Sequence, residues 1–248
     1  MRNSKPKKPN YGYYALPILT ILLAIVFVVG FLLAVFVWLI PGLILMGFGI
    51  YVVLSYAASL FLMNQTRASE LPRMIELEGK EEVLDVGCGL GKMTIGIAKH
   101  LKKGKAIGID IWNRMEIGGN SAENAYENAE REGVRDRVEF KYGNLLEIPF
   151  GDGSFDVVTA QSVLNNLHGE KDKPKAFKEI QRVLKPHGKF LMLEPLRNLR
   201  GFFTFTPFAF SSLTSKDKWL ELLKKAGFIN IQYAYENGLG VFLAEKPI

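Results

Sequence analysis

The feature that most constrains this chain of 248 residues is a run without a single charged side chain, from residue 15 to residue 63. As one straight helix, which rises about 1.5 Å per residue, the run would far exceed the ~30 Å hydrocarbon core of a bilayer. It therefore has to turn back. Pro41 and Gly42 mark the place, because proline removes a helical donor and glycine permits a tight turn. The sequence predicts a hairpin of two helices, residues 16–40 and 43–63, each long enough to cross a membrane.

Three other structures compete with a membrane-spanning hairpin. A signal peptide has an apolar stretch of about 7–15 residues, much shorter than this run, and no cleavage pattern is seen. A hairpin buried in a soluble core would carry polar residues on its outer faces, which are absent here. A hairpin that dips into one leaflet and returns stays open as an alternative, since the turn is short and apolar. We expect a spanning hairpin.

Charge sets the expected orientation of this hairpin. The residues before Asn64 include no acidic residue, and their only charges are four basic side chains in the tail of residues 1–14: Arg2, Lys5, Lys7 and Lys8. Two crossings return the chain to its starting side, and the positive-inside rule makes that side the cytoplasm. We therefore expect a two-pass protein of the cell membrane, with both termini and the following domain cytoplasmic and the lipid bilayer as a partner.

The rest of the chain has the charge of an ordinary soluble domain. Without the four tail residues, 27 basic side chains stand against 25 acidic ones, so nothing favours nucleic-acid binding. Cys88 is the only cysteine, which excludes an intrachain disulfide, and no paired Cys and His spacing indicates zinc. We expect neither nucleic acid nor metal as a partner.

After a linker and short helix in residues 64–80, with the helix at 71–78, buried strands alternate with amphipathic helices. This alternation predicts an α/β domain in residues 81–248: a Rossmann-like, doubly wound, mainly parallel sheet of seven strands. Asn237-Gly238 is a strong hairpin signal, so the C-terminal strands should be antiparallel. Strands are expected at residues 82–86, 106–111, 138–142, 155–160, 190–193, 228–235 and 241–244. Helices are expected at 93–101, 121–133, 175–184 and 218–226, the last after a capping box at 214–217.

A glycine-rich turn, Asp-Val-Gly-Cys-Gly-Leu-Gly at residues 85–91, follows the first strand and opens a helix. Glycines let a ligand approach the backbone, and the helix N-terminus offers free N–H groups. Dinucleotide, phosphate and S-adenosylmethionine sites all use such turns. A dinucleotide fingerprint would need glycine where this chain has Lys92. Asp85 would also repel a pyrophosphate but suits a cationic amine, so a nicotinamide oxidoreductase is disfavoured.

The chain resembles class I S-adenosylmethionine-dependent methyltransferases, especially the subgroup with ubiquinone, menaquinone, sterol and phospholipid methyltransferases. The resemblance runs from about residue 81 to residue 246. It includes the segment Glu-Ile-Gln-Arg-Val-Leu-Lys-Pro-His-Gly-Lys at residues 179–189. It implies S-adenosyl-L-methionine as the cofactor. The turn of residues 83–91 would cradle its methionine part, through Asp85, Gly87, Gly89 and Gly91.

The resemblance also implies roles for residues at the ends of later strands. Asp110 would accept both ribose hydroxyls, a task that suits a carboxylate, and Ile111 would flank the adenine. Asn144 and Leu145 fall where the family usually has an aspartate at the adenine amino group, and the side-chain carbonyl of Asn144 can accept that bond. Gln161 ends the fourth strand and completes the predicted cofactor site.

The expected acceptor follows from the region after the fifth strand. Five phenylalanines lie in residues 201–210, where the family places substrate-covering elements. Both a core-filling loop and an apolar lid against bilayer or substrate agree with them. With the hairpin, they favour a membrane-resident or lipophilic acceptor: a lipid headgroup, a quinone or other isoprenoid, or a hydrophobic small molecule. His168 and Glu194 are candidates for a base, without assignment of a catalytic residue. Two alternatives are a tethered cofactor-binding module that acts through a protein partner and a methyltransferase for a membrane-proximal protein.

Overall fold

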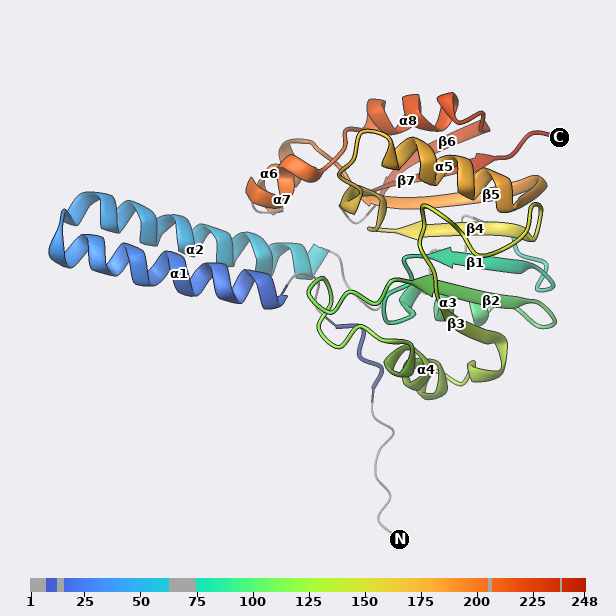
Figure 1. Cartoon of the computed structure of the whole chain (residues 1–248), viewed down its shortest axis with the longest axis horizontal. Helices are drawn as coiled ribbons and strands as arrows, with labels where there is room; N and C mark the ends of the chain where they lie inside the picture. The colour runs from blue at the N-terminus through green and yellow to red at the C-terminus, as the bar shows by residue number, and fades with distance from the viewer. Residues whose placement is uncertain (1–7, 13–15, 63–74, 205–206, 237) are drawn as a thin grey trace, which may run out of the picture.

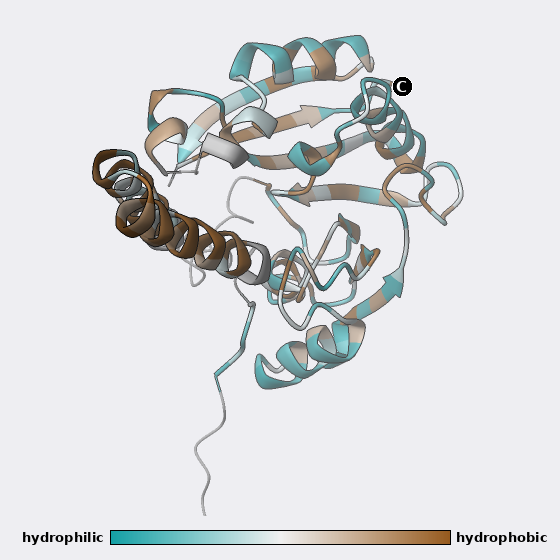
Figure 2. Ribbon diagram, turned by 60° about the vertical axis from the view of Figure 1, so that its left-hand side comes forward, coloured by the Kyte–Doolittle hydropathy of each residue, from teal (hydrophilic) through white to brown (hydrophobic). Residues whose placement is uncertain are grey.

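The computed structural model describes residues 8–12, 16–62, 75–204, 207–236 and 238–248, and it has two parts (Figure 1). A pair of long antiparallel helices projects from one side of an α/β domain. The helical pair is largely apolar along its length, whereas polar and apolar residues are mixed over the domain (Figure 2). The predicted α/β fold behind an apolar hairpin is thus confirmed.

The hairpin consists of α1 (Leu16–Phe36) and α2 (Leu39–Leu62), joined by a two-residue turn. The turn lies four residues earlier than the sequence predicted, and Pro41 is instead the third residue of α2. Proline is tolerated there because the N–H groups of a first helical turn have no partner within the helix. Gly42 serves packing: a Cβ there would overlap the backbone of Ala34 on α1, so its absence lets the helices lie close together.

Seven strands form one sheet in the order β3-β2-β1-β4-β5-β7-β6. The first five in this order are parallel, while β7 pairs antiparallel with both β5 and β6. The winding direction reverses between β1 and β4, whose carboxyl ends form the switch point at which such sheets bind ligands. The strands are β1 (Glu82–Val86), β2 (Lys105–Asp110), β3 (Val138–Tyr142), β4 (Phe155–Gln161), β5 (Leu184–Pro195), β6 (Ile229–Glu236) and β7 (Leu239–Glu245).

Four longer helices cover the sheet: α3 and α4 bury residues in one core cluster, and α5 and α8 in the other. Ser121 caps α4 as predicted, since its hydroxyl accepts the N–H of Asn124. The cap of α8 is Ser215, one residue after the start of the predicted capping box. The helices are α3 (Lys92–Ala98), α4 (Ala122–Arg131), α5 (Asp172–Val183) and α8 (Lys216–Lys225), with 3-10 turns η2 (Arg135–Arg137) and η3 (Leu164–Asn166).

Two short helices follow β5 and lie beside the hairpin: α6 (Leu199–Thr204) and α7 (Pro207–Ser212) (Figure 1). They occupy the phenylalanine-rich stretch. The helix that the sequence predicted at residues 71–78 falls half outside the described residues, and its described part, residues 75–78, is not helical.

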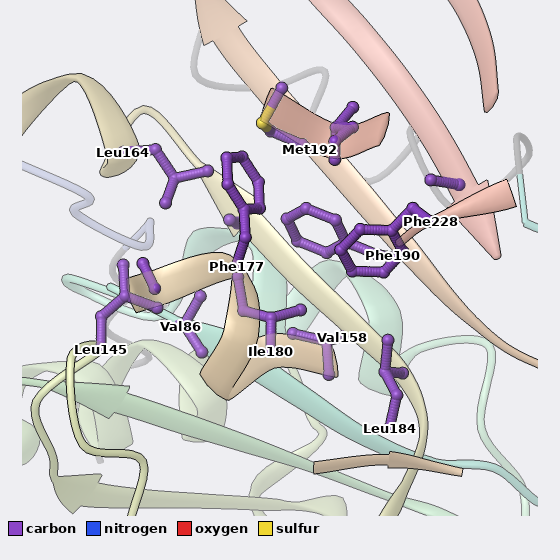
Figure 3. Close-up of a cluster of buried hydrophobic side chains, with 14 of the residues drawn as sticks. Val86, Leu145, Val158, Leu164, Phe177, Ile180, Leu184, Phe190, Met192 and Phe228 are labelled. Carbon is purple, nitrogen blue, oxygen red and sulfur yellow. The ribbon is translucent and has the colours of Figure 1, made fainter. Parts of the chain in front are cut away.

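The larger core cluster is aromatic and lies under α5 and α8. The ring of Phe177 meets Phe190, Trp219 and Phe228 edge-on, at centroid distances of 6.0, 6.0 and 6.5 Å. Phe190 also stacks on Phe228 at 5.5 Å, and Figure 3 shows these phenylalanines gathered on one side of β4 and β5. Each such pair contributes about 0.5–1.5 kcal/mol beyond burial. The cluster therefore fixes β5, whose carboxyl end borders the switch point.

Candidate active site

The glycine-rich turn between β1 and α3 forms one wall of the site. Gly87, Gly89 and Gly91 have φ angles of 68°, 52° and 84°, a region that other residues rarely adopt. The N–H groups of Gly87 and Cys88 both donate to the carbonyl of Ile109 near the end of β2, at 2.8 and 3.1 Å. The turn is therefore folded against β2 in a conformation that depends on its glycines.

Asp85 lies beneath this turn and is 1% exposed. One carboxylate oxygen accepts the N–H and the hydroxyl of Thr94 on α3, at 3.0 and 2.6 Å, and the other accepts the hydroxyl of Thr159 on β4 at 2.9 Å. Burial raises the pKa of Asp85 to about 6, although these hydrogen bonds oppose the rise. Asp85 thus ties α3 to β1 and β4. The predicted role of Asp85 toward the cofactor stays a prediction.

Asp110, half-buried at the end of β2, joins the loop after β1 to the loop after β2. One carboxylate oxygen accepts the N–H of Gly89 at 2.8 Å. The other accepts the N–H of Trp112 at 2.7 Å and the side-chain amide of Asn120 at 3.2 Å. A carboxylate has about four acceptor positions, so one position stays open. Both ribose hydroxyls can be accepted only if an internal bond lengthens, and the ribose role of Asp110 stays a prediction.

Two buried polar atoms at this edge of the sheet have no hydrogen-bond partner: the side-chain oxygen of Asn120 and the hydroxyl of Ser162. Asn120 belongs to the loop after β2, and Ser162 follows β4. Buried polar atoms in folded proteins ordinarily have partners, so these two atoms fit a site for a polar ligand such as the expected cofactor. Among the residues that the structure describes, no group of three or more His, Cys, Asp or Glu could hold a metal ion.

The other predicted cofactor residues differ in exposure. Ile111 is 50% exposed beside the end of β2, where its side chain can lie against a flat ring. Gln161 is the half-buried last residue of β4. Asn144 is exposed, but its side-chain carbonyl already accepts a backbone N–H two residues ahead at 2.8 Å. Leu145 is 6% exposed and packs into the core, and its predicted role at the adenine stays a prediction.

Glu194, near the end of β5, is fully buried on the opposite side of the switch point. One oxygen accepts the N–H groups of Val163 and Leu164 at 2.9 and 2.8 Å, and the other accepts the side-chain amide of Asn165 at 2.8 Å. Burial raises the pKa of Glu194 to about 7. These bonds hold the segment after β4, so Glu194 acts as a positioning residue. His168, the other candidate base, is exposed further along this segment.

Residues 197–213, between β5 and α8, form an insert that is closed at its base. Leu196 and Thr214 pair as an isolated bridge, and the N–H of Arg197 donates to the carbonyl of Thr214 at 3.0 Å. The buried side chain of Asn165 fastens this base, since its carbonyl accepts the N–H of Thr214 at 2.9 Å while its amide donates to β5. The insert is therefore anchored at the carboxyl end of β5.

Beyond its base, the insert reaches the hairpin. The hydroxyl of Tyr51, in the middle of α2, donates to the carbonyl of Phe202 on α6 at 3.0 Å. Phe202 meets Phe203 and Phe210 edge-on at 5.4 and 5.3 Å, yet Phe202 and Phe203 stay 40% and 59% exposed. The side chains of the other two phenylalanines lie outside the described part of the chain. The described rings thus form a surface beside the hairpin, and Phe202 and Phe203 do not fill a core.

A family model for a methyltransferase domain matches residues 77–227, which is more than half of the chain. The chain belongs to this methyltransferase family. It is a class I S-adenosylmethionine-dependent methyltransferase, and S-adenosyl-L-methionine is its cofactor. The glycine-rich turn, Asp110 and the unpaired atoms of Asn120 and Ser162 together make a polar edge that fits this cofactor.

Curated relatives of the methyltransferase bear names of the same chemistry. This chain is 30% identical over 200 residues to demethylmenaquinone methyltransferase of Lactococcus lactis, and the aligned region covers 69% of this chain and 75% of that one. It is 39% identical over 121 residues to the protein of the same name from Lactiplantibacillus plantarum, covering 48% and 47%. It is 37% identical over 145 residues to erythromycin 3''-O-methyltransferase of Saccharopolyspora erythraea, covering 56% and 44%. For the latter two, the chain spans about half of the relative's length.

Solved structures share the fold of the methyltransferase at low identity. A SAM-dependent methyltransferase from Aquifex aeolicus has a TM-score of 0.60 at 20% identity, covering 73% of this chain and 89% of that one. The [4+2]-cyclase SpnF has a TM-score of 0.59 at 19% identity, covering 74% and 82%. Since one of these is named for a cyclisation, the fold alone does not define the reaction.

Several residues of the site carry no signal in the sequence. Thr94, Thr159 and Asn120 are ordinary polar residues by spacing, and their contacts form only when separate strands and loops meet. In residues 164–168, the sequence indicated His168 as a candidate base. In the structure, Asn165 is the residue of this segment that joins Glu194 to the base of the insert. The only signal for Asn165 in the sequence was a pair of asparagines between two leucines, at residues 164–167.

Proposed function

We propose that this methyltransferase is anchored in the cell membrane by its hairpin and methylates a lipophilic acceptor that resides in the bilayer. The exposure of the hairpin supports the anchoring. A helix in a soluble core buries its large apolar side chains, and a bilayer would remove these from water. Both helices are long and apolar enough to cross a membrane. Side chains that are 57–76% exposed include Phe31, Phe36, Ile40, Ile44 and Leu54.

A contact between the segment before the hairpin and the domain after it supports the proposed topology. Asn10, which precedes α1, is hydrogen-bonded to Asn128 on α4 of the α/β domain. This contact supports a topology in which both ends of the hairpin lie on one side of the bilayer. Two crossings satisfy this condition, as does a dip into one leaflet, and the helix lengths favour two crossings. The basic tail favours the cytoplasmic side.

The position of the insert supports a lipophilic acceptor. Tyr51, which bonds to Phe202, lies 11 residues before Leu62 at the end of α2, a distance of about 16 Å along the helix. In a hydrocarbon core of ~30 Å, this point is about midway across. In a spanning hairpin, α6 would lie at the depth of the lipid chains, while the base of the insert stands at the carboxyl end of β5. An acceptor that moves along the insert would pass from lipid to the site without crossing water.

The names of the relatives favour a quinone as the acceptor class. Two of them are demethylmenaquinone methyltransferases, from Lactococcus lactis and Lactiplantibacillus plantarum. A demethylated quinone with a lipophilic tail is a molecule that a membrane-facing insert would admit. We therefore propose a quinone of this kind as the acceptor.

The residues of this chain would act mainly by positioning. When bound, S-adenosylmethionine supplies an activated methyl group on a sulfonium. The glycine-rich turn and Asp110 would hold that donor, and Glu194 fixes the segment after β4 beside the acceptor. Alignment of two reactants in a closed site can lower a barrier by about 7–11 kcal/mol. A base is needed only if the acceptor atom must lose a proton.

The test is incubation of the full-length protein in native membranes with methyl-labelled S-adenosylmethionine, followed by separation of lipid and protein. We expect label in a quinone fraction of the lipid extract. Gly87→Val serves as the inactive control, because a Cβ at Gly87 would overlap Val163. Label in protein would favour a methyltransferase for a membrane-proximal protein. Cofactor binding without label in either fraction would favour a tethered binding module.

A further inference from the structure

A segment that precedes the membrane hairpin is built into the cofactor side of the α/β domain. The main chain of Asn10 exchanges two hydrogen bonds with the side-chain amide of Asn128 on α4. Its N–H donates to the amide oxygen and its carbonyl accepts from the amide nitrogen, both at 2.8 Å. Asn128 is 1% exposed. Residues 8–12, which we call the strap, are thus part of the domain although the hairpin separates them from it in sequence.

Asn128 also holds the glycine-rich turn. Its amide nitrogen donates a second hydrogen bond, to the carbonyl of Leu90 at 3.1 Å. Leu90 lies between Gly89 and Gly91 and is itself 4% exposed. One buried side chain therefore joins the strap, α4 and the turn that carries the conformationally demanding glycines. A buried amide with this many partners fixes the relative position of all three segments.

Gly12 places the strap against both loops of the cofactor side. The side chain of Asn10 accepts the N–H of Gly12 at 3.0 Å and bends the strap, and Gly12 has a φ angle of 66°. A Cβ at Gly12 would lie 2.7 Å from Ile117 and 3.1 Å from Leu90. Ile117 belongs to the loop that follows Asp110. The strap therefore covers the place where the loop after β1 meets the loop after β2.

Tyr11 adds an apolar contact between these two positions. Its ring packs against the core cluster under α3 and α4, and its hydroxyl lies 3.5 Å from a carboxylate oxygen of Glu132. Burial and the nearby Glu132 raise the pKa of Tyr11 above its ordinary value. The strap is thus held by polar contacts at Asn10 and by packing at Tyr11 and Gly12.

We propose that the strap closes the cofactor site, with Asn128 as the positioning residue that couples it to the glycine-rich turn. The strap is fastened to the turn and touches the loop after Asp110, so it resists the separation of these two loops during cofactor exchange. Because only residues 13–15 separate the strap from α1, the same contacts connect cofactor binding to the hairpin. The proposal concerns the cofactor and does not depend on the identity of the acceptor.

The test uses the full-length protein in phosphatidylcholine nanodiscs, with S-adenosylhomocysteine as the ligand. Calorimetry measures its Kd and stopped-flow fluorescence its dissociation rate. Asn128→Asp keeps the size of the side chain but turns an oxygen toward the carbonyls of Asn10 and Leu90. We expect Kd to rise about tenfold, the scale of one to two lost hydrogen bonds, mainly through faster dissociation.

A second variant perturbs the strap without changing Asn128. Gly12→Val drives a side chain into Ile117 and Leu90, and it should raise Kd by a similar factor. Gly133→Val is the matched control, because Gly133 has nearly the same φ angle, 70°, but open space where its Cβ would lie. It carries the same backbone strain without the contact, so its Kd should equal that of wild type. Combining Gly12→Val with Asn128→Asp should add little, since each substitution already releases the same short strap.

Deletion of residues 2–12 with the hairpin retained should also raise Kd, and a synthetic peptide of residues 1–12 should restore it. Wild-type Kd and dissociation rate in both the Gly12→Val and deletion proteins would overturn the proposal, even if their melting temperatures fell. Lower melting temperature with unchanged ligand binding would show that the strap only stabilises the fold. If Asn128→Asp fails to fold, the Gly12→Val and deletion proteins decide.

Discussion

Asp110 is the residue whose replacement should separate cofactor recognition from folding. It is half-buried at a strand end, so we expect Asp110→Ala to leave the fold intact. The substitution should weaken S-adenosylmethionine binding by about 1.5–3 kcal/mol, the scale of hydrogen bonds to a charged group. Calorimetry measures the change. Part of the lost binding free energy can come from a change in the glycine-rich turn, because Asp110 also accepts the N–H of Gly89.

A ligand that lacks a ribose hydroxyl distinguishes the two contributions. Wild type should bind S-adenosylhomocysteine more tightly than its 2′-deoxy analogue, whereas Asp110→Ala should bind both equally. Asp152→Ala is a suitable control, because the side chain of Asp152 is 82% exposed in a distant turn. Equal discrimination by all three proteins would show that the ribose assignment is wrong.

Two buried carboxylates should give the domain a characteristic pH dependence. Burial raises the pKa of Asp85 from 3.8 to about 6 and that of Glu194 from 4.5 to about 7, so the folded protein holds these protons more tightly than the unfolded chain. Their contribution to stability is complete below the unfolded values and is lost as the pH rises through the folded values. We expect the free energy of unfolding of wild type, relative to that of Glu194→Gln, to fall between about pH 5 and about pH 8.

Urea unfolding of both proteins across this range measures the effect. Glu221→Gln is the control, because the pKa of the partly exposed Glu221 lies below its usual 4.5, so this carboxyl does not titrate in this range. The difference in free energy of unfolding between Glu221→Gln and wild type should stay constant across this range. A constant difference for Glu194→Gln as well would mean that Glu194 does not titrate at a raised pKa.

Single residues were predictable from sequence where backbone conformation demanded them. Gly87, Gly89 and Gly91 form a local pattern, and all three have positive φ angles. Asn128 and Asn120 could not be found in this way, because a lone asparagine on a helix or loop usually faces solvent. Their burial comes from contacts with distant segments, which no local spacing records.

At the scale of elements, the insert of residues 197–213 should be required for membrane acceptors but not for the fold. Serine at both Phe202 and Phe203 should change thermal stability little, because these rings are 40% and 59% exposed. Turnover on membranes should fall sharply, since each ring can contribute on the order of 1–3 kcal/mol when it contacts lipid or a lipophilic acceptor. Cofactor affinity should be nearly unchanged. Thermal melting, calorimetry and a methyl-transfer assay measure the three effects.

Phe228→Ser is the comparison variant for the loss of a ring that lies in the core. Phe228 is 4% exposed, and truncation of a buried aromatic ring costs roughly 3–5 kcal/mol. If the Phe202 and Phe203 double variant unfolds in the same way, the insert is structural. If it stays folded with full activity on membranes, the insert has no part in the reaction.

Elements with a clear hydrophobic pattern were predicted closely. The strands at residues 82–86 and 138–142 match β1 and β3, because short apolar runs between turn residues leave few alternatives. The hairpin turn was misplaced because proline and glycine also fit other positions. Pro41 fits the first turn of α2, and Gly42 fits the close approach to Ala34. Which use applies depends on how the two helices pack.

At the scale of the whole molecule, a chain that begins at Ser69 should test the division into parts. From the sequence, such a fragment should be soluble and bind cofactor, because the motifs begin after residue 81. The structure adds that it would lack the strap and uncover Asn128, Leu90 and Ile117. We expect it to bind S-adenosylhomocysteine about tenfold more weakly than the full chain by calorimetry, and to lose activity on lipophilic acceptors. A fragment that binds no cofactor would show that the strap or the hairpin is an essential part of the domain, and the deletion of residues 2–12 with the hairpin retained would distinguish the two.

The two-part organisation was predictable because a long charge-free run can hardly lie in a small soluble domain. The contact between the strap and α4 was not, since it joins Asn10 to a residue 118 positions away. Nothing in a basic, polar tail distinguishes a docked segment from a solvated one. That contact becomes visible only when the folded domain presents a buried amide to it.

β7 is the last strand to be synthesised, although it is an interior strand of the sheet. It fills the position between β5 and β6 and pairs with both. If the hairpin is a membrane anchor, as we propose, a nascent chain can insert it long before residues 239–248 leave the ribosome. Until then, one edge of β5 is open and β6 has no neighbour in the sheet. In a protein anchored as we propose, biosynthesis would hold an unfinished sheet at the membrane surface, and a nonsense mutation at residue 239 would leave it permanently open.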